Sequence, residues 1–335
     1  MNDDVSIDCV WNNWNLLQYI KKGRKNLSLI TDLFLSLLWS EDHTLLFPHQ
    51  YGFRAGLSCT SQLIYLFHTW VSALDKGKTS DVVSLDFEKA CDSVPHVHLY
   101  LKLQQYGILG QILEWLSDFL LEQYQRVVLE GESSNWTKVS SGVPQGSIVG
   151  PILFLLYVND IPENLSCASE MFADDTLLFN SGNPSDVSSP IQDSLSQILD
   201  WCNESLLRMN PKKCESMRIT RSKTPSLCSY NINSTSLNHL GVILSSDLSL
   251  KMHVLTVAAR ANKILGLLKR TFGKCSEAII TGYKTMVRPT IEYVCPVWNP
   301  HQQYLSDKLE KVQRNVSRWI LGSSIEYNER LEYLG

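Results

Sequence analysis

Residues 171–179 read MFADDTLLF, so that two adjacent acids, Asp174 and Asp175, stand between two short apolar runs. Short apolar runs on either side of a polar pair are typical of two strands joined by a tight turn, and we expect a β-hairpin here. Two carboxylates about 4 Å apart at a partly buried site repel by roughly 4 kcal/mol at an effective dielectric constant of 20. A turn open to water, a basic partner or a metal ion has to offset this repulsion. Taken alone, the stretch favours the solvated turn.

A further carboxylate follows another apolar segment. VVSLDF (82–87) predicts a strand, and Asp86 would emerge at its end from the core into a cleft. The alternative is that Asp86 caps a helix that begins within residues 87–92, which is a common role for Asp.

A loop rich in glycine and proline lies between these two acidic segments. It opens SSGVPQGSIVGPILFLLYVNDIP (140–162) and leads into a strongly apolar run. Its glycines allow the backbone to approach a ligand closely, and Ser141 or Ser147 could cap the helix that follows. The alternative is a plain junction between a loop and a buried helix.

The three segments have a joint chemical meaning. Two Mg²⁺ ions held by carboxylates can activate a 3′-hydroxyl and stabilise the leaving oxygen in an in-line phosphoryl transfer. Because Mg²⁺ takes few protein carboxylates together with phosphate oxygens, two or three Asp residues suffice. One carboxylate from a strand and two from a neighbouring hairpin therefore predict a metal-dependent nucleotidyl transfer site.

Composition excludes several classes of protein. The 335 residues are 44% hydrophobic and 19% charged, as in a globular protein of one large or two to three small domains. The apolar run 29–39 contains Asp32 and is too short to span a bilayer, so no membrane partner is expected. Asp3 and Asp4 replace the basic start of a signal peptide. Nine dispersed cysteines without a CxxC pair fit reduced thiols inside a cell and argue against zinc. We expect an intracellular protein, nuclear and/or cytoplasmic, that is not secreted.

Charge is distributed unevenly along the chain. The formal net charge is −4, yet residues from 251 onward hold 13 Lys and Arg against 7 Asp and Glu. An acidic body followed by a basic C-terminal part suits a chain that binds metal ions in one place and phosphates in another.

Strand and helix patterns interleave without a regular βαβ period, which favours an α+β fold. Apolar residues recur at helical spacing in 191–209 and 309–320, and the second of these predicted helices has a basic face. HLGVIL (239–244) is a further strand candidate. The stretches 181–190 and 220–236 are rich in turn residues and are expected to be surface loops.

The ordered segments resemble the reverse transcriptase of non-long-terminal-repeat (LINE-type, jockey- or CR1-like) retrotransposons. VSLDFEKACDSVPH (83–96), SGVPQGSIVGPILFLLYVNDIP (141–162) and FADDTLLF (172–179) are similar to its first three palm motifs. The resemblance covers about residues 45–325. It also includes QYGFRAGLSCTSQL (50–63), YGILGQILEWLSDFLLEQYQRVVLEG (106–131), MNPKKCESM (209–217), HLGVIL (239–244), VRPTIEYVCPVW (287–298) and LEKVQRNVSRWI (309–320).

The resemblance implies a right-hand polymerase fold, with a palm of antiparallel sheet and helices, fingers and a helical thumb. It implies a divergent N-terminal segment at 1–40, and fingers and palm at 41–245 with the catalytic core at 81–215. A basic, helical thumb or connection-like region would occupy 246–335. The expected activity is RNA-directed DNA polymerisation, in which two Mg²⁺ ions, or Mn²⁺, promote nucleotidyl transfer to a primer 3′-hydroxyl. The expected partners are an RNA template, a DNA primer and deoxynucleoside triphosphates, while the oligomeric state is left open.

Site residues follow from the same resemblance. The metal-ligating and catalytic carboxylates would be Asp86, Asp174 and Asp175, and Lys213 would protonate the departing pyrophosphate; the alternative for Lys213 is a solvated side chain after a turn. The remaining roles are nucleotide binding by Phe87, Cys91, Gln145, Gly146 and Arg54, and a primer grip at Leu240 and Gly241.

Four features depart from the family pattern. Cys91 stands where the family usually has Phe, so discrimination against a 2′-hydroxyl should loosen. Leu57 stands where a second basic residue usually follows GFR, which removes a charge-assisted contact of roughly 1–3 kcal/mol. Residues 1–40 lack the usual upstream motif, and out-of-frame or intron-derived sequence is one explanation. Within these 335 residues we expect neither an endonuclease domain before the polymerase segments nor a zinc knuckle after them. Two alternatives remain: an inactive, transposon-derived remnant that at most binds RNA, and a group II intron-type maturase.

Overall fold

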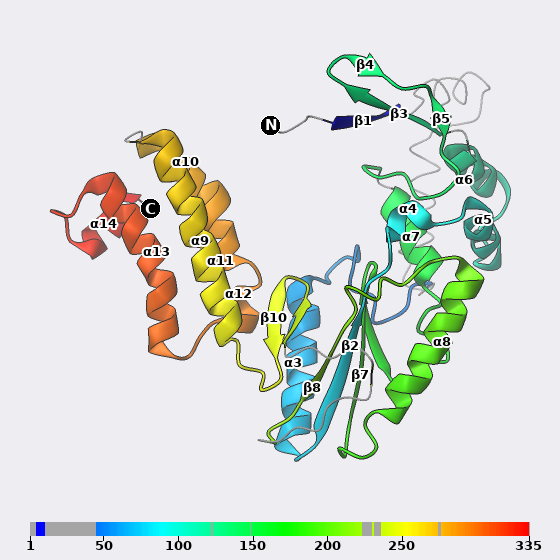
Figure 1. Cartoon of the computed structure of the whole chain (residues 1–335), viewed down its shortest axis with the longest axis horizontal. Coiled ribbons are helices and arrows are strands. Elements are labelled where there is room, and N and C mark those ends of the chain that lie inside the picture. Colours follow the sequence, from blue (N-terminus) through cyan, green and yellow to red (C-terminus); the bar gives the residue numbers. More distant parts are fainter. Residues whose placement is uncertain are drawn as a thin grey trace. The chain divides into compact units, whose positions relative to one another are not determined.

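The computed structural model describes residues 5–10, 45–121, 123–147, 149–222, 230, 236–273 and 276–334 (Figure 1). The chain divides into two compact units, each built from separate stretches of sequence. Unit 1 comprises Met1–Leu57, Val83–Asn180 and Ser188–Cys214, and unit 2 comprises Ser58–Val82, Ser181–Val187 and Glu215–Gly335. The division passes through strands β2 (Thr79–Leu85) and β7 (Asp175–Gly182), so each unit contains part of both.

A four-stranded sheet has the strand order β6-β7-β2-β8, where β6 is Ala168–Phe172 and β8 is Glu215–Ile219. β6 and β7 pair antiparallel, with Phe172 opposite Asp175, so that only Ala173 and Asp174 form the loop of the hairpin. The expected hairpin at 171–179 is therefore confirmed.

The strand predicted at 82–87 is β2, which ends at Leu85, directly before Asp86. Asp86 does not cap a helix. The short helix α4 (Ala90–Ser93) begins after Lys89, which is in the left-handed conformation and makes no side-chain cap. The helix-cap interpretation of Asp86 is therefore wrong.

Unit 1 is organised around helix α7 (Val149–Val158). Every residue of α7 except Pro151 is buried, as expected of a helix that is hydrophobic on all sides. The other elements of this unit are α5 (His96–Gln105), α6 (Gly110–Leu121), α8 (Ser189–Ser205), β1 (Val5–Val10), β3 (Tyr124–Leu129), β4 (Glu132–Ser133) and β5 (Thr137–Lys138). β3 pairs with β1, β4 and β5, antiparallel in each case.

Polar residues that follow α7 fasten neighbouring segments of unit 1. Asn159 accepts a hydrogen bond from the Phe47 amide and donates one to the Leu45 carbonyl, both at 2.6 Å. Asp160 accepts hydrogen bonds from Lys102 Nζ at 2.7 Å and from Trp201 Nε1 at 2.9 Å. These contacts fix the segment that leads to Gln50.

Unit 2 consists mainly of helices, and α9 (Lys251–Phe272) runs alongside α11 (Arg288–Glu292) and α13 (Gln303–Leu321) (Figure 1). A buried cluster at this contact contains Leu265, Leu268, Val312 and Val316. The remaining elements are α3 (Cys59–Asp75), β9 (Ser236–His239), β10 (Val242–Ser245), α10 (Ser276–Gly282), the π-helix η1 (Tyr283–Val287), α12 (Cys295–Trp298) and α14 (Tyr327–Leu334).

A buried ion pair fixes the part of the sheet that belongs to unit 2. Arg218 on β8 donates to both carboxylate oxygens of Asp81 on β2, at 2.6 and 2.7 Å, and Tyr230 donates to the same carboxylate at 3.2 Å. Both charged residues are buried. Replacing one partner by a neutral residue would leave the other charge buried and unpaired, which would strongly lower the stability of the fold.

The helix predicted at 309–320 is confirmed by α13. The helix predicted at 191–209 is confirmed by α8 only as far as Ser205, because Leu206 has a positive φ of 55° and ends the helix. Val312 and Val316 of α13 are buried, and its four basic residues, Lys308, Lys311, Arg314 and Arg318, are exposed. A continuous strand at 239–244 is wrong, because Leu240 and Gly241 form the turn between β9 and β10.

Several expectations fall outside the described residues. These are the segment 1–40 apart from β1, and most of the loop 220–236. The domain boundaries at 40 and 245 stay predictions. Within the described residues, no helix combines the length and apolarity needed to cross a membrane.

Candidate active site

Asp86 is positioned by the backbone around it, all within unit 1. Its carbonyl accepts a hydrogen bond from the Asn210 amide at 2.8 Å, and the Glu88 amide donates to the Arg208 carbonyl at 2.8 Å. Residues 210–213 then form a turn, in which the Lys213 amide donates to the Asn210 carbonyl. This turn brings Lys213 Nζ to 3.3 Å from Asp86 Oδ1.

The hairpin places the other two acids at the loop that joins β6 and β7. Asp174 is the second residue of the loop, and Asp175 begins β7. Ala173, the first loop residue, has a φ of 56°, which is a left-handed conformation that costs a non-glycine residue free energy. Both aspartates are partly buried.

The electrostatics show that these acids act on one another. Burial, opposed by a backbone hydrogen bond and reinforced by Asp86, raises the pKa of Asp174. Burial, then Asp174 and Asp86, raises the pKa of Asp175 to about 6. Lys213 lowers the pKa of both acids. One ammonium group therefore faces three carboxyl groups, and this excess of negative charge favours a cation.

The side chains present fit a divalent metal ion. Asp86 Oδ2 is buried without a hydrogen-bond partner, so an acceptor is already desolvated where a cation would bind. Oxygen donors are those that Mg²⁺ and Mn²⁺ prefer. Among the described residues, no group of three or more His, Cys, Asp and Glu side chains is placed so that it could hold a metal ion by itself.

The loop 141–147 is fastened to α4 and the residue after it. The amides of Gly142 and Val143 donate to the carbonyls of Val94 and Cys91, each at 2.8 Å. Gly142 has a φ of 94°, and a Cβ there would lie 2.8 Å from the Asp92 carbonyl oxygen, so this close approach requires glycine. The loop is thus held against the segment that carries Cys91.

Side chains of the same loop complete these contacts. Gln145 is exposed, and its Nε2 donates to Asp92 Oδ1 at 2.7 Å. Ser147 accepts a hydrogen bond from the Gly150 amide at 2.8 Å, which makes it the residue that caps α7. Gly146 is exposed and has a φ of 79°. The roles of Gln145 and Gly146 in nucleotide binding stay predictions.

Cys91 and Phe87 differ in their surroundings. Burial, with Asp174 and Asp92 as smaller causes, raises the pKa of the Cys91 thiol to about 11, so the thiol is neutral at pH 7. Phe87 is buried, and its ring packs edge-on against Trp201 with ring centres 6.2 Å apart. The influence of Asp174 on the Cys91 pKa shows that the thiol lies near this carboxylate. The roles of Cys91 and Phe87 in nucleotide binding stay predictions.

The Arg54 guanidinium contacts its own loop. Its Nη1 donates to the carbonyls of Phe47 and Pro48, both at 3.0 Å, and of Gln50 at 3.2 Å. These three hydrogen bonds hold the backbone of residues 47–50 in a turn around the guanidinium. Contact with an incoming triphosphate stays a prediction for Arg54.

The predicted primer grip lies in unit 2. Leu240 and Gly241 have φ values of 47° and 77° and form the two-residue turn between β9 and β10. Tyr293 Oη donates to the Leu240 carbonyl at 3.1 Å, and a Cβ on Gly241 would lie 3.3 Å from the Tyr293 ring. A role for this turn in primer binding stays a prediction.

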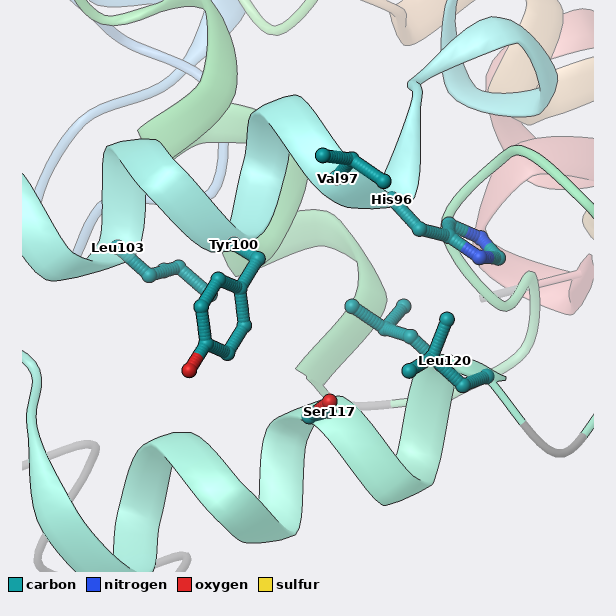
Figure 2. A pocket seen from close by; sticks show the side chains of 7 residues that line it. His96, Val97, Tyr100, Leu103, Ser117 and Leu120 are labelled. Atoms are coloured by element: carbon teal, nitrogen blue, oxygen red, sulfur yellow. The ribbon is translucent and has the colours of Figure 1, made fainter.

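The structure also has an apolar cavity of about 260 Å³, and His96, one of its lining residues, shares a hydrogen bond of 2.8 Å with the Gly142 carbonyl. The cavity is lined by side chains of α5 and α6, among them His96, Tyr100, Leu103 and Ser117 (Figure 2). None of the described residues that line it is an acid. The cavity therefore offers none of the chemistry expected of a phosphoryl-transfer site.

Comparison with known proteins identifies the family of this chain. A profile of the family described as reverse transcriptase (RNA-dependent DNA polymerase) matches residues 21–244. The chain belongs to this family. The match begins within the segment 1–40 that the sequence alone left unassigned.

Related reverse transcriptases come from mobile elements. The chain is 28% identical over 295 residues to a probable RNA-directed DNA polymerase from transposon X-element of Drosophila melanogaster, covering 82% of this chain and 32% of the relative. It is 24% identical over 310 residues to the RNA-directed DNA polymerase from mobile element jockey of the same organism, covering 86% and 33%. The chain thus spans about a third of the length of these relatives. The predicted kinship with non-long-terminal-repeat retrotransposon reverse transcriptases is confirmed.

A solved structure supports the fold alone. The apo telomerase of Candida tropicalis has a TM-score of 0.51 at 12% identity, covering 96% of this chain and 55% of that protein. The α+β, right-hand polymerase fold expected of this reverse transcriptase is therefore confirmed.

One residue of the site was missed by the sequence reasoning. Gln50 opens a recognised motif, yet no role was predicted for it, and its side chain contacts the loop of the β6–β7 hairpin. A buried glutamine between His49 and Tyr51 carries no pattern that distinguishes it from a solvated one. Its burial appears only in the folded chain.

Proposed function

We propose that this chain is the RNA-directed DNA polymerase domain of a LINE-type retrotransposon. In this proposal it adds deoxynucleotides to the 3′-hydroxyl of a DNA primer on an RNA template. The observation that carries the proposal is the electrostatic coupling of Asp86, Asp174 and Asp175 with Lys213 beside them.

Asp86, Asp174 and Asp175 would hold two Mg²⁺ ions, for which Mn²⁺ is a substitute. When bound, such ions supply Lewis-acid activation of the 3′-hydroxyl and neutralise charge at the leaving pyrophosphate. Repulsion among the three carboxylates raises their affinity for a cation.

Lys213 has a position suited to proton delivery. Its side chain is 67% exposed, and its Nζ lies 3.3 Å from Asp86 Oδ1, so it is free to turn toward a substrate in the site. An ammonium group there can donate a proton to the departing pyrophosphate. The chain's own contribution is thus a set of fixed carboxylates and one mobile donor.

The basic face of α13 supports binding of nucleic acid. Its exposed residues, Lys308, Lys311, Arg314 and Arg318, would contact phosphates of the template and primer. The remaining substrates are deoxynucleoside triphosphates, and the site of action is nuclear and/or cytoplasmic. An inactive remnant gains no support from the site, since its three carboxylates and Lys213 lie together.

Primer extension on poly(rA) with an oligo(dT) primer and Mg²⁺ tests the proposal. We expect Asp174→Asn to lower the rate at least about 1,000-fold, because it removes a metal ligand while keeping the side-chain shape. Asp186→Asn, at an exposed loop residue, is the matched control and should retain the wild-type rate. Equal rates for wild type and Asp174→Asn would disprove the proposal.

A further inference from the structure

The buried side chain of Gln50 contacts the loop of the β6–β7 hairpin from outside. Gln50 Oε1 accepts hydrogen bonds from the Ala173 amide and the Gly52 amide, both at 2.9 Å. Gln50 Nε2 donates to the Ala173 carbonyl at 3.4 Å. The amide group of Gln50, which is 2% exposed, therefore contacts both sides of the residue that precedes Asp174.

The backbone on either side of Gln50 follows the hairpin. The Tyr51 amide donates to the Met171 carbonyl at 2.8 Å, and the Met171 amide donates to the His49 carbonyl at 3.0 Å. This segment thus pairs in parallel with the edge of β6. Arg54, through its bonds to the carbonyls of residues 47–50, and Asn159, through Leu45 and Phe47, fix the same segment in turn.

The contact is too close to tolerate a side chain at residue 52. A Cβ on Gly52 would lie 2.5 Å from the Ala173 backbone nitrogen. Gly52 and Gln50 therefore both pack against Ala173, which is the loop residue with the left-handed φ of 56°. Ala173 has no intrinsic preference for that conformation, so external contacts have to supply it.

We propose that Gln50 is a positioning residue, which holds Ala173 in its left-handed conformation and thereby sets the direction of the Asp174 carboxylate. The inference rests on the proposed function, because the role of Asp174 as a metal ligand belongs to it. In this role Gln50 acts on catalysis through its contacts with the loop of the hairpin.

Two substitutions of Gln50 separate its hydrogen bonds from its volume. Gln50→Met keeps a similar shape and removes the acceptor and the donor. Gln50→Glu keeps an acceptor for the Ala173 and Gly52 amides. The matched control is Gln62→Met on α3, since Gln62 is also buried and its side-chain amide has no hydrogen-bond partner.

Hydrogen exchange gives a readout that does not depend on activity. In Gln50→Met we expect the Ala173 and Gly52 amides to exchange at least tenfold faster, while amides within β7 at 177–179 keep their protection. Gln50→Glu should preserve the protection of Ala173, and Gln62→Met should leave it unchanged. Unaltered exchange at Ala173 in a folded Gln50→Met protein would overturn the inference.

Kinetics supply the functional arm. Gln50→Met should lower kcat at least tenfold, with the KM for deoxynucleotides within threefold of wild type, and should require a higher Mg²⁺ concentration for half-maximal rate. Gln62→Met should change kcat by less than twofold. Equal kcat losses in the two methionine variants would overturn the inference.

A second route keeps the test decisive if Gln50→Met fails to fold. Gly52→Ala leaves the glutamine in place and pushes on the Ala173 amide, so it should reproduce the higher Mg²⁺ requirement and the kcat loss. Wild-type activity in a folded Gly52→Ala protein would count against the inference. If the wild type itself extends no primer while Ala173 loses protection in Gln50→Met, the proposed function fails and the structural contact stands.

Discussion

Two hairpins of this molecule have loops of the same length that are maintained in different ways. The β6–β7 loop is Ala173-Asp174 and the β9–β10 loop is Leu240-Gly241, and each begins with a non-glycine residue of positive φ. In the second loop the next residue is a glycine with a φ of 77°, which is the local chemistry that two-residue hairpins prefer. In the first loop the next residue is Asp174, a candidate metal ligand.

The difference shows where each conformation is encoded. Gly241 lets the β9–β10 turn adopt a positive φ at low cost, and Tyr293 adds one hydrogen bond to the Leu240 carbonyl. Neither residue of the β6–β7 loop is a glycine, and Gln50 and Gly52 from a distant part of the chain contact Ala173. In a loop without glycine, contacts with the surrounding structure thus have to offset the free energy cost of the left-handed backbone conformation.

The largest expected effect comes from breaking the externally held loop. Ala173→Pro fixes φ near −65°, so the left-handed conformation is lost, and it removes the N–H group that donates a hydrogen bond to Gln50 Oε1. We expect the rate of primer extension to fall at least about 1,000-fold and the free energy of unfolding to fall by about 3 kcal/mol. Extension assays and urea unfolding measure the two quantities, and an active Ala173→Pro protein would show that the loop conformation is dispensable.

The hairpins also differ in the buried group that each contains. Burial raises the pKa of Glu170 on β6 to about 8, with His49 Nδ1 2.8 Å from Oε1, whereas burial lowers the pKa of His239 on β9 to about 4. The folded state keeps Glu170 protonated where the unfolded chain is ionised, so stability falls as pH rises from about 4.5 to about 8. The folded state keeps His239 neutral where the unfolded chain is protonated, so stability falls as pH drops from about 6.5 to about 4.

Thermal unfolding at several pH values tests this opposition. Glu170→Gln should remove the loss of stability that occurs as pH rises from about 4.5 to about 8. His239→Gln should remove the loss of stability that occurs as pH drops from about 6.5 to about 4. Each group contributes at most about 1.4 kcal/mol per pH unit. The same pH profile for both variants would contradict the assignment of one group to each hairpin.

A smaller effect is expected from the locally encoded turn. Gly241→Ala places a side chain at positive φ and against the Tyr293 ring, so we expect it to lower the free energy of unfolding by about 1–2 kcal/mol. Gly146→Ala, also at positive φ but with open space around it, is the control for strain without the contact. An equal loss in both proteins would assign the whole effect to backbone strain.

The smallest effect concerns the hydrogen bond on the β9–β10 loop. Tyr293→Phe removes the bond to the Leu240 carbonyl at a partly exposed position, and we expect a loss of about 0.5–1 kcal/mol in denaturant unfolding. A loss as large as that of Gly241→Ala would mean that Tyr293, and not the glycine, maintains this loop.

The sequence predicted what depends on local pattern. Alternating short apolar runs predicted β2, β6 and β7, and helical spacing predicted α8 and α13. It also placed Asp86 and the Asp174–Asp175 pair next to strand ends, where polar residues follow an apolar run. These predictions succeeded since burial and hydrogen bonding in a strand or helix act over a few residues.

Other features depend on contacts between distant residues. Gln50 and Ala173 are 123 positions apart in the sequence, so their hydrogen bonds leave no local pattern. The strand expected across 239–244 was wrong because Leu240 is apolar yet adopts a left-handed turn conformation. Asp86 was weighed as a helix cap, but the pairing of residues 86–88 with 208–210 holds it instead. Such outcomes are decided by the whole fold.

The burial of α7 has a practical consequence for work with shortened versions of the protein. Its apolar side chains are covered on all sides, in part by contacts with α5 and by a hydrogen bond from Tyr157 to the Ser205 carbonyl of α8. A fragment that ends after residue 158 keeps this helix and discards β6, β7 and α8. Such a fragment would expose the apolar side chains on all sides of α7 and would aggregate during expression. A soluble fragment for binding studies should therefore extend at least through Cys214, where the last stretch of unit 1 ends.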